Sequence, residues 1–271
     1  MKFIVLFIFI TQLLGCANTA TYGSSNVEGG TVHLYSGNKT APTILYVPGC
    51  NGLDTGGVIY QNYHISRFKE VWPEANIVVS QYVNDYTYGA SGGRCDWDGS
   101  DPRIKDKQSW HQAEHTIKLG EWIKQQPWSN GEVHLFAFSW GGRVGIWVPG
   151  DLRGRAGAFK SVALIWPDCR PVHKIRAGKL HTPTRIWSTE NDPLSIPKNC
   201  PSYYSGTEDM LTLSLYPGAT HSWMTGPAFT PYTRWWPTQK VNVRSEYNET
   251  WSKQTFGDWK NWAMNLGSKV N

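Results

Sequence analysis

Three residues that lie far apart along this sequence could together carry out nucleophilic chemistry. Ser139 ends the apolar run of residues 133–138 and is followed by glycines, whereas Asp192 and His221 each come after a later predicted strand. A serine hydroxyl is a poor nucleophile until a neighbouring base removes its proton, and the base needs a partner that fixes its tautomer. A serine, a histidine and an acid in this arrangement predict acyl transfer.

The residues around Ser139 are typical of a sharp turn between a strand and a helix. On such a turn the backbone is crowded, so the positions two before and two after the serine must be small. Ala137 and Gly141 occupy these positions. Taken alone, the pattern also fits an ordinary connection that happens to contain a serine.

Two other carboxylates could take the place of Asp192 as the acid. Glu190 is close to Asp192 in sequence, and Asp168 is a weaker candidate because it follows an earlier strand.

The elements that must position these residues alternate between strands and helices. Strands are predicted at Thr43–Val47, 76–82, 133–138, 161–166, 184–188 and Leu211–Tyr216, and helices over 59–71, after Ser139, from a capping box at 109–112 as far as Pro127, and around 259–266. This order implies an α/β fold with a mostly parallel sheet covered by helices on both faces. Ligands bind such sheets at the carboxyl ends of the strands. The long polar stretch of residues 84–108 is expected to be a functional loop.

Three motifs follow one another along the chain: Ser139-Trp140-Gly141-Gly142, Asn191-Asp192-Pro193-Leu194 and Tyr216-Pro217-Gly218-Ala219-Thr220-His221. In this order they resemble the motifs of the dienelactone hydrolase-like family of the α/β-hydrolase superfamily. The resemblance covers residues 43–223 and implies the α/β-hydrolase fold, with Ser139 as nucleophile, His221 as base and Asp192 as acid. It implies an ester substrate and no cofactor. The enzymes that give the family its name carry Cys at the nucleophile position, so Ser139 departs from their pattern and their substrate is not implied.

The same resemblance suggests which backbone groups stabilise the oxyanion that acyl transfer creates. The donors would be the N–H groups of Trp140 and of Cys50, which lies in the loop after the first long strand. Pro48 and Gly49 in that loop depart from the His-Gly common in relatives. Asn51 is therefore an alternative to Cys50.

The first residues have the pattern of an export signal. Lys2 precedes the apolar run of residues 3–10, which is too short to span a bilayer as a mature helix but suits a signal peptide over residues 1–15. Residues 13–16 resemble the lipobox of bacterial lipoproteins, which predicts lipidation of Cys16 and an anchor in the bacterial cell envelope, facing the periplasm or the exterior. The alternative is cleavage after Ala17, giving a soluble periplasmic or secreted protein. Residues 16–30 would form a flexible tether, and residues 31–271 a single domain.

With Cys16 taken by lipid, four of the five cysteines remain, an even number suited to an oxidising compartment. Three pairings are possible on paper. We prefer Cys50 with Cys95 and Cys169 with Cys200, because these pairs close the shorter loops between consecutive strands. Free buried thiols are the alternative.

Composition and a second motif limit the possible partners. The formal charge of +5 is spread along the chain, so a nucleic-acid partner is not expected. His111-Gln112-Ala113-Glu114-His115 fits the H-x-x-E-H pattern of inverted zinc peptidases, but zinc needs a third ligand that the sequence does not identify. We therefore expect no metal. The oligomeric state is left open.

Aromatic residues crowd two segments, one over residues 86–110 and one after His221. They predict either buried packing of long loops or a stacking wall for a sugar or an aromatic acyl group. They are Tyr86, Tyr88, Trp97 and Trp110 in the first segment, and Trp223, Phe229, Tyr232, Trp235 and Trp236 in the second.

Taken together, the motifs and the export signal favour a serine esterase. A peptidase or amidase with the same triad, or a non-catalytic envelope binding protein on the same scaffold, are the alternatives.

Overall fold

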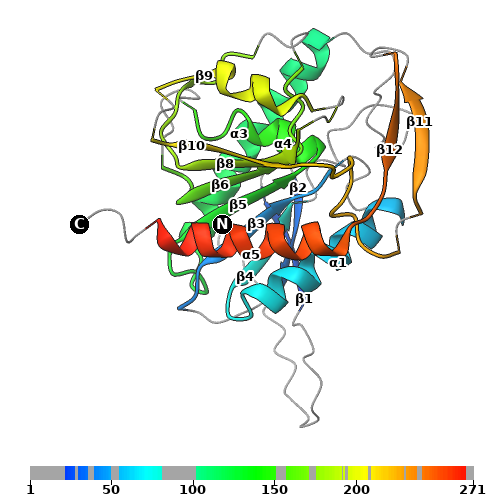
Figure 1. Ribbon diagram of the computed structural model, residues 1–271. Helices are drawn as coiled ribbons and strands as arrows, with labels where there is room; N and C mark the ends of the chain where they lie inside the picture. The colour runs from blue at the N-terminus through cyan, green and yellow to red at the C-terminus, as the bar shows by residue number, and fades with distance from the viewer. Residues whose placement is uncertain are drawn as a thin grey trace.

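The computed structural model shows a central sheet with helices on both sides (Figure 1). It describes residues 22–27, 30–35, 40–49, 55–80, 102–150, 157–170, 175–190, 192, 195–206, 209–228, 230–236 and 240–266. The predicted signal peptide, Cys16, Cys50, Asn51, Cys95 and residues 84–101 of the polar stretch lie outside these ranges, as do the last two residues of the strand predicted at 76–82. None of the helices within them is long and apolar enough to span a membrane.

The main sheet has eight strands in the order β1-β2-β4-β3-β5-β6-β8-β10. Those from β4 to β10 in this order pair in parallel, whereas β1 and β2 are antiparallel at one edge. Their bounds are β1 Tyr22–Val27, β2 Gly30–Tyr35, β3 Thr43–Val47, β4 Asn76–Ser80, β5 Val133–Phe138, β6 Ser161–Ile165, β8 Thr184–Thr189 and β10 Leu211–Tyr216. Every residue of β3, β4, β5 and β6 is buried, as expected for parallel strands covered on both faces.

Alternate residues of the central strands enter two cores, one on each face of the sheet. In β5, Phe136 and Phe138 pack with α1 (Thr55–Val71) and α5 (Glu249–Asn265). Leu135 and Ala137 point the other way, toward α3 (Pro102–Lys124) and α4 (Trp140–Gly145). This alternation follows from the two-residue period of a strand. The chain therefore fixes β5, and with it Ser139, from both sides.

Several predicted elements are confirmed, and others are corrected. β3 and β10 have the predicted bounds, and β6 ends one residue early because Trp166 takes a φ of 50°, outside the strand region. The predicted capping box is wrong: α3 starts at Pro102, and Ser109 is buried inside it, donating to the Asp106 carbonyl at 3.0 Å. Proline suits a first helical turn, so residues 102–108 of the polar stretch belong to this helix.

Other elements have no counterpart in the predictions. β1 occupies part of the expected tether, so the sheet begins at Tyr22 instead of near Thr31. Outside the main sheet, β11 (Tyr232–Trp236) pairs with β12 (Val241–Ser245) in a two-stranded antiparallel ribbon. Between β8 and β10 lie the 3₁₀ helix η1 (Pro197–Tyr203) and β9 (Tyr204–Ser205), which pairs with β7 (Gly178–Lys179). These pieces are short or polar, and sequence periodicity does not detect them.

Candidate active site

Ser139 lies on the turn between β5 and α4, with backbone angles φ 55° and ψ −113°. Positive φ is uncommon for a residue with a Cβ atom and costs free energy, so it persists only where the surroundings impose it. Here the Ser139 N–H donates to the Ile165 carbonyl at 2.8 Å, and the Ser139 carbonyl accepts from the Arg143 N–H at 3.0 Å. The predicted sharp strand-to-helix turn is confirmed.

Glycines let this turn lie against its neighbours. A Cβ atom on Gly141 would be 2.3 Å from the Val47 carbonyl oxygen, and one on Gly142 would be 2.8 Å from that of Ile165. A Cβ on Gly49, in the segment after β3, would be 2.9 Å from the Ser139 Cβ. No side chain fits at these distances, so α4 packs directly on the ends of β3 and β6. The small residue expected at Gly141 is thus required by contact.

Asp192 and His221 come together at the carboxyl ends of β8 and β10. The His221 Nδ1 is 2.7 Å from Asp192 Oδ2, with the Asp192 side chain fully buried and that of His221 13% exposed. An imidazole that donates Nδ1–H to a carboxylate presents Nε2 as its basic nitrogen. The geometry therefore suits a base held in one tautomer by an acid.

Trp166 links this pair to Ser139. Its ring centroid is 4.9 Å from that of His221, and the residue before it, Ile165, accepts the Ser139 N–H. The indole also contacts Phe138 at 4.7 Å between centroids, which places it under the turn that carries Ser139. Among the described residues no hydrogen bond joins Ser139 to His221. The nucleophile candidate and the base candidate thus flank the same strand end without a direct bond.

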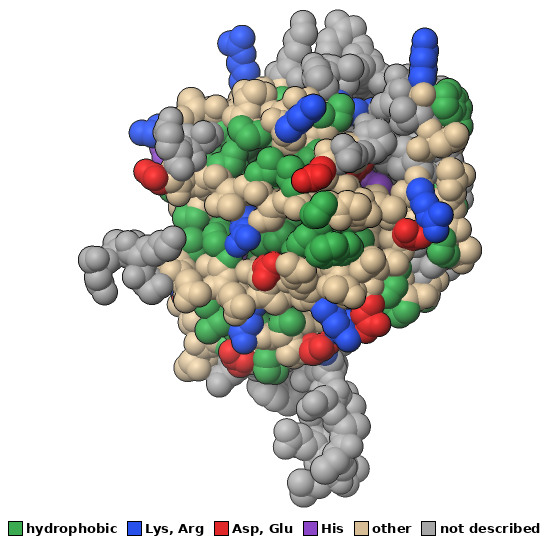
Figure 2. All heavy atoms as spheres, viewed as in Figure 1, with side chains coloured by type: hydrophobic (Ala, Val, Ile, Leu, Met, Phe, Trp, Pro, Cys, Tyr) green, Lys and Arg blue, Asp and Glu red, His purple; other side chains and the backbone are tan. Residues whose placement is uncertain are grey.

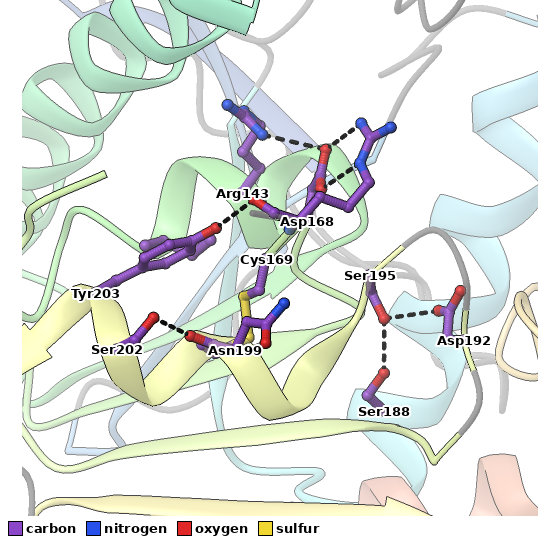
Figure 3. The surroundings of a disulfide bond; sticks show 12 residues. Arg143, Asp168, Cys169, Ser188, Asp192, Ser195, Asn199, Ser202 and Tyr203 are labelled. Carbon is purple, nitrogen blue, oxygen red and sulfur yellow. Dashed lines mark hydrogen bonds and ion pairs between the residues drawn. A yellow bond between two sulfur atoms is a disulfide. The ribbon is translucent and has the colours of Figure 1, made fainter. Parts of the chain in front are cut away.

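The alternative acids make other contacts. Glu190 is exposed, and Asp168 is buried in an ion cluster with Arg143 and Arg170 (Figure 3). Arg170 donates to both Asp168 oxygens at 2.8 and 2.6 Å, and Arg143 donates to Asp168 at 3.1 Å and also bonds Asp106. Burial lowers the pKa of Arg143, while Asp168 and Asp106 act in the opposite direction. Asp192 is therefore the candidate acid that contacts His221.

Arg143 was not among the predicted site residues, although it follows Ser139 by one helical turn. It is fully buried within α4, and its guanidinium joins α3 to the segment after β6 through Asp106 and Asp168. Buried charges are expected to be paired, so an arginine next to glycines at this turn was the available signal. Its partners are distant in sequence and could not be identified from it.

The predicted disulfide between Cys169 and Cys200 is confirmed, with the two Cα atoms 5.1 Å apart. It joins the segment after β6 to η1, beside the Asp168 cluster (Figure 3). The second preferred pair, Cys50 with Cys95, lies outside the described residues. The first bridge therefore fastens the segment that follows Asp192.

The helix with the H-x-x-E-H pattern has a different role beside the site. Gln112, within the pattern, accepts a hydrogen bond from the Trp140 indole at 2.8 Å, and His115 is buried. His111 Nδ1 lies 3.8 Å from a carboxylate oxygen of Glu114, and the His111 ring packs edge-on against Trp110 at 4.9 Å between centroids. In the part of the chain that the structure describes, no three His, Cys, Asp or Glu side chains gather as a metal site would require. Gln112 thus fixes the residue that follows Ser139.

Aromatic residues near the site divide between the two predicted roles. Trp223 is fully buried, which fits packing, whereas Tyr232 and Trp235 on the β11–β12 ribbon are 45% and 51% exposed. The ribbon is fastened to the base candidate, because Ser245 pairs with His221 and the Glu246 N–H donates to the His221 carbonyl at 3.3 Å. Tyr86, Tyr88, Trp97 and Phe229 lie outside the described ranges.

No protein-family model matches this chain, and no curated protein sequence matches it. Solved structures are similar to it in fold. A structure of an arylesterase has a TM-score of 0.56 and 9% identity, covering 93% of this chain and 86% of its own. Carboxyl esterase 2 from the mycorrhizal fungus Tuber melanosporum has a TM-score of 0.54 and 13% identity, covering 91% and 88%. MGS-M1, an α/β hydrolase enzyme from a Medee basin deep-sea metagenome library, has a TM-score of 0.52 and 12% identity, covering 91% and 98%. Together with the mostly parallel sheet, these likenesses show that the chain has the α/β-hydrolase fold.

Proposed function

We propose that this protein is a serine hydrolase that cleaves a carboxylic ester through Ser139, His221 and Asp192. The observation that carries the proposal is the 2.7 Å hydrogen bond between the buried Asp192 carboxylate and the partly exposed His221, formed beside a serine with positive φ. Strained backbone of this kind collects at functional sites, where it presents a side chain in a set direction. The names of two structures of similar fold, an arylesterase and a carboxyl esterase, favour an ester over other acyl substrates.

The reaction would proceed in two halves. His221 Nε2 takes the hydroxyl proton as Ser139 Oγ attacks the ester carbonyl, and then gives that proton to the departing alcohol. In the second half, water attacks the acyl-enzyme and His221 accepts its proton; the bond from Ser139 Oγ to the acyl carbon breaks, Oγ takes the proton back from His221, and the carboxylic acid leaves. Because hydrogen bonds of catalytic groups are often loose without substrate, Oγ and Nε2 are expected to close on each other in the substrate complex.

The oxyanion formed in each half needs backbone donors. We assign this role to the N–H groups of Trp140 and Cys50. Two contacts support Trp140: its side chain is fixed by Gln112, and its backbone is fixed by the turn at Ser139. Gly49, against the Ser139 Cβ, brings the backbone before Cys50 to the same place.

A fluorophosphonate probe tests the nucleophile directly, because it bonds covalently only to an activated serine. We expect the parent protein to be labelled at Ser139 and to hydrolyse p-nitrophenyl acetate. Ser139→Ala should abolish labelling and lower kcat/KM by about 10⁴-fold. Ser66→Ala, an exposed serine of α1 that bonds only its own turn, is the matched control and should behave as the parent does.

Labelling that persists in Ser139→Ala would contradict the proposal, as would an unlabelled parent. A comparison of the acetate ester with the matching p-nitroanilide separates the ester reading from a peptidase or amidase. Faster turnover of the anilide would replace the ester hydrolase with an amidase that uses the same residues.

We also propose that the domain is held in the bacterial cell envelope by a lipid on Cys16. The support is the resemblance of residues 13–16 to a lipobox, together with the Cys169–Cys200 disulfide, since disulfides persist in oxidising compartments. Mass spectrometry of the mature N-terminus is the test. An unmodified terminus downstream of Cys16 would exclude the anchor and leave a soluble exported protein.

A further inference from the structure

Two more buried serines lie beside Asp192, and neither belongs to the proposed triad (Figure 3). Ser195 Oγ is 2.8 Å from Asp192 Oδ2, the same oxygen that bonds His221. Ser188 Oγ, from β8, is in turn 2.9 Å from Ser195 Oγ. The exposed fractions of Ser195 and Ser188 are 1% and 0%. Water therefore does not compete for these hydrogen bonds.

The direction of these bonds follows from the protons available. An ionised carboxylate has no proton to donate, so Ser195 must donate to Asp192. A hydroxyl has a single proton, so Ser195 can then only accept from Ser188. The result is a one-way chain in which Ser188 donates to Ser195 and Ser195 donates to Asp192, while His221 donates to the same carboxylate oxygen.

The backbone around Ser195 is also fixed. Its carbonyl accepts from the Cys169 N–H at 2.7 Å, and the following Ile196 N–H donates to the Asp192 carbonyl at 3.0 Å. Cys169 is bonded to Cys200 in η1, which begins directly after Ile196. Ser195 is thus held from both sides at a fixed place beside the acid.

We propose that Ser195 is a positioning residue for the reaction, which holds the Asp192 carboxylate ionised and in one orientation toward His221. This inference rests on the serine hydrolase function proposed above. Burial of a carboxylate away from water disfavours its ionised form, and hydrogen-bond donors stabilise that form. The nearby cation Arg170 acts on Asp192 through its charge, but its guanidinium is hydrogen-bonded to Asp168. Ser195 is a buried hydroxyl donor to Asp192 Oδ2, in addition to the charge that Arg170 supplies.

Steady-state kinetics of variants at this position test the proposal. In Ser195→Ala, kcat for p-nitrophenyl acetate should fall roughly tenfold while KM changes less than about twofold, because a charge-assisted bond is lost without a substrate contact. Ser195→Thr keeps the hydroxyl and should recover most of the loss. Ser188→Ala leaves Ser195 able to donate, so kcat should fall only about threefold. Titration of active sites with a fluorophosphonate corrects each rate for unfolded protein.

Ser202→Ala is the matched control, because this exposed serine of η1 donates to the Asn199 carbonyl at 2.6 Å and does not contact Asp192. Its kcat should equal that of the parent. A parent-like kcat in Ser195→Ala would overturn the positioning role, and so would equal losses in Ser195→Ala and Ser195→Thr. Parent-like rates in Ser188→Ala would overturn the one-way chain.

These outcomes are distinct from failure of the proposed function. If the parent protein neither reacts with the probe nor hydrolyses the ester, the triad itself is wrong. If the parent is active and loses its activity in Ser139→Ala, but Ser195→Ala matches the parent, only the role of Ser195 is wrong.

Discussion

Among the described residues, two histidines are hydrogen-bonded to a carboxylate, at opposite ends of the sheet, and they differ in what the second ring nitrogen does. At the amino end of β5, His134 Nε2 lies 3.0 Å from Glu132, and its Nδ1 lies 2.7 Å from Ser161 Oγ. At the carboxyl ends of the strands, His221 uses Nδ1 for Asp192, and its Nε2 has no hydrogen-bond partner among the described residues. The His134 ring is fully buried and both its nitrogens bond fixed protein groups, so a substrate cannot reach it, whereas the His221 ring is 13% exposed. The comparison separates a structural pair from one that can act as a base.

The backbone conformation also differs between the two ends of the sheet. Ser139, Trp166 and Ser222 take φ values of 55°, 50° and 77° around His221, whereas the turn that leads to His134 places its positive φ of 84° on Gly131. Glycine adopts this conformation without the steric cost that a Cβ atom adds. The amino end thus avoids strain, and the carboxyl end retains it where a side chain must be presented.

The largest expected effect comes from removing each histidine in turn. His221→Ala should lower kcat/KM for p-nitrophenyl acetate by about 10⁴-fold with little change in Tm, because the base is lost from a partly exposed position. His134→Ala should leave kcat/KM within about threefold of the parent. It should lower the free energy of unfolding by about 2–4 kcal/mol, since it opens a buried cavity and removes the partner of Ser161.

Ester hydrolysis and urea unfolding of both variants provide the measurements. A His134→Ala protein that is stable but inactive would reverse the assignment of the two pairs. Equal losses of activity and of stability in both variants would remove the distinction between them.

The next effect concerns the disulfide, which braces only the carboxyl end. Cys169 and Cys200 are separated by 31 residues, and a loop of this length gives a loss of about 3–4 kcal/mol in the free energy of unfolding when the bridge is removed. We expect this loss in the Cys169→Ala, Cys200→Ala double variant, measured by urea unfolding. Because the Cys169 N–H holds the Ser195 carbonyl, loosening of this segment without the bridge should also lower kcat, whereas loss of the His134 pair should not. A double variant as stable as the parent would show that hydrogen bonds alone hold this segment.

The smallest effect is expected at the amino end, as a dependence of stability on pH. Hydrogen bonding with His134, and then with Lys160, lowers the pKa of Glu132 from its ordinary value of 4.5 to about 2, against the opposing effect of burial. A lowered pKa in the folded protein means that the carboxylate stabilises the fold above pH 4.5 and loses this effect as the pH falls toward 2. The Tm of the parent should therefore exceed that of Glu132→Gln at pH 6, and the difference should shrink below pH 4.5.

Glu121→Gln, at an exposed position of α3, is the control for the loss of one surface charge. A Tm difference for Glu132→Gln that is constant between pH 6 and pH 3 would contradict the assignment. So would a loss of kcat in this variant, because Glu132 lies at the end of the sheet away from Ser139.

Much of the fold could be predicted because it depends on local patterns. The apolar run of β3 and the alternation in β10 gave their bounds, and the small residues around Ser139 predicted its turn. The pairing of Cys169 with Cys200 followed from their place in consecutive loops. Ser139, Asp192 and His221 each follow a predicted strand, and this order predicted that they lie at the carboxyl ends of the strands.

The remainder depends on contacts between residues that are distant in sequence. Asp168 was a possible acid until Arg143 and Arg170 were seen to bind it. The first turns of α3 are polar and lack the helical spacing of apolar residues, because Asp106 there pairs with the buried Arg143. Ser195 is different, because its partners Asp192 and Ser188 are close in sequence, but no periodic pattern marks the turn that brings the three side chains together.

The attachment of His221 to residues 245–248 means that the site depends on a segment that carries none of its three candidate residues. Ser245 pairs with His221, Glu246 bonds its carbonyl, and Asn248 bonds the carbonyl of Trp223. The turn at Ser139, by contrast, is held by Ile165 and Arg143, which lie in β6 and α4. The nucleophile candidate is therefore positioned from within the central sheet, and the base candidate from the strand β12 and the segment that leads into α5.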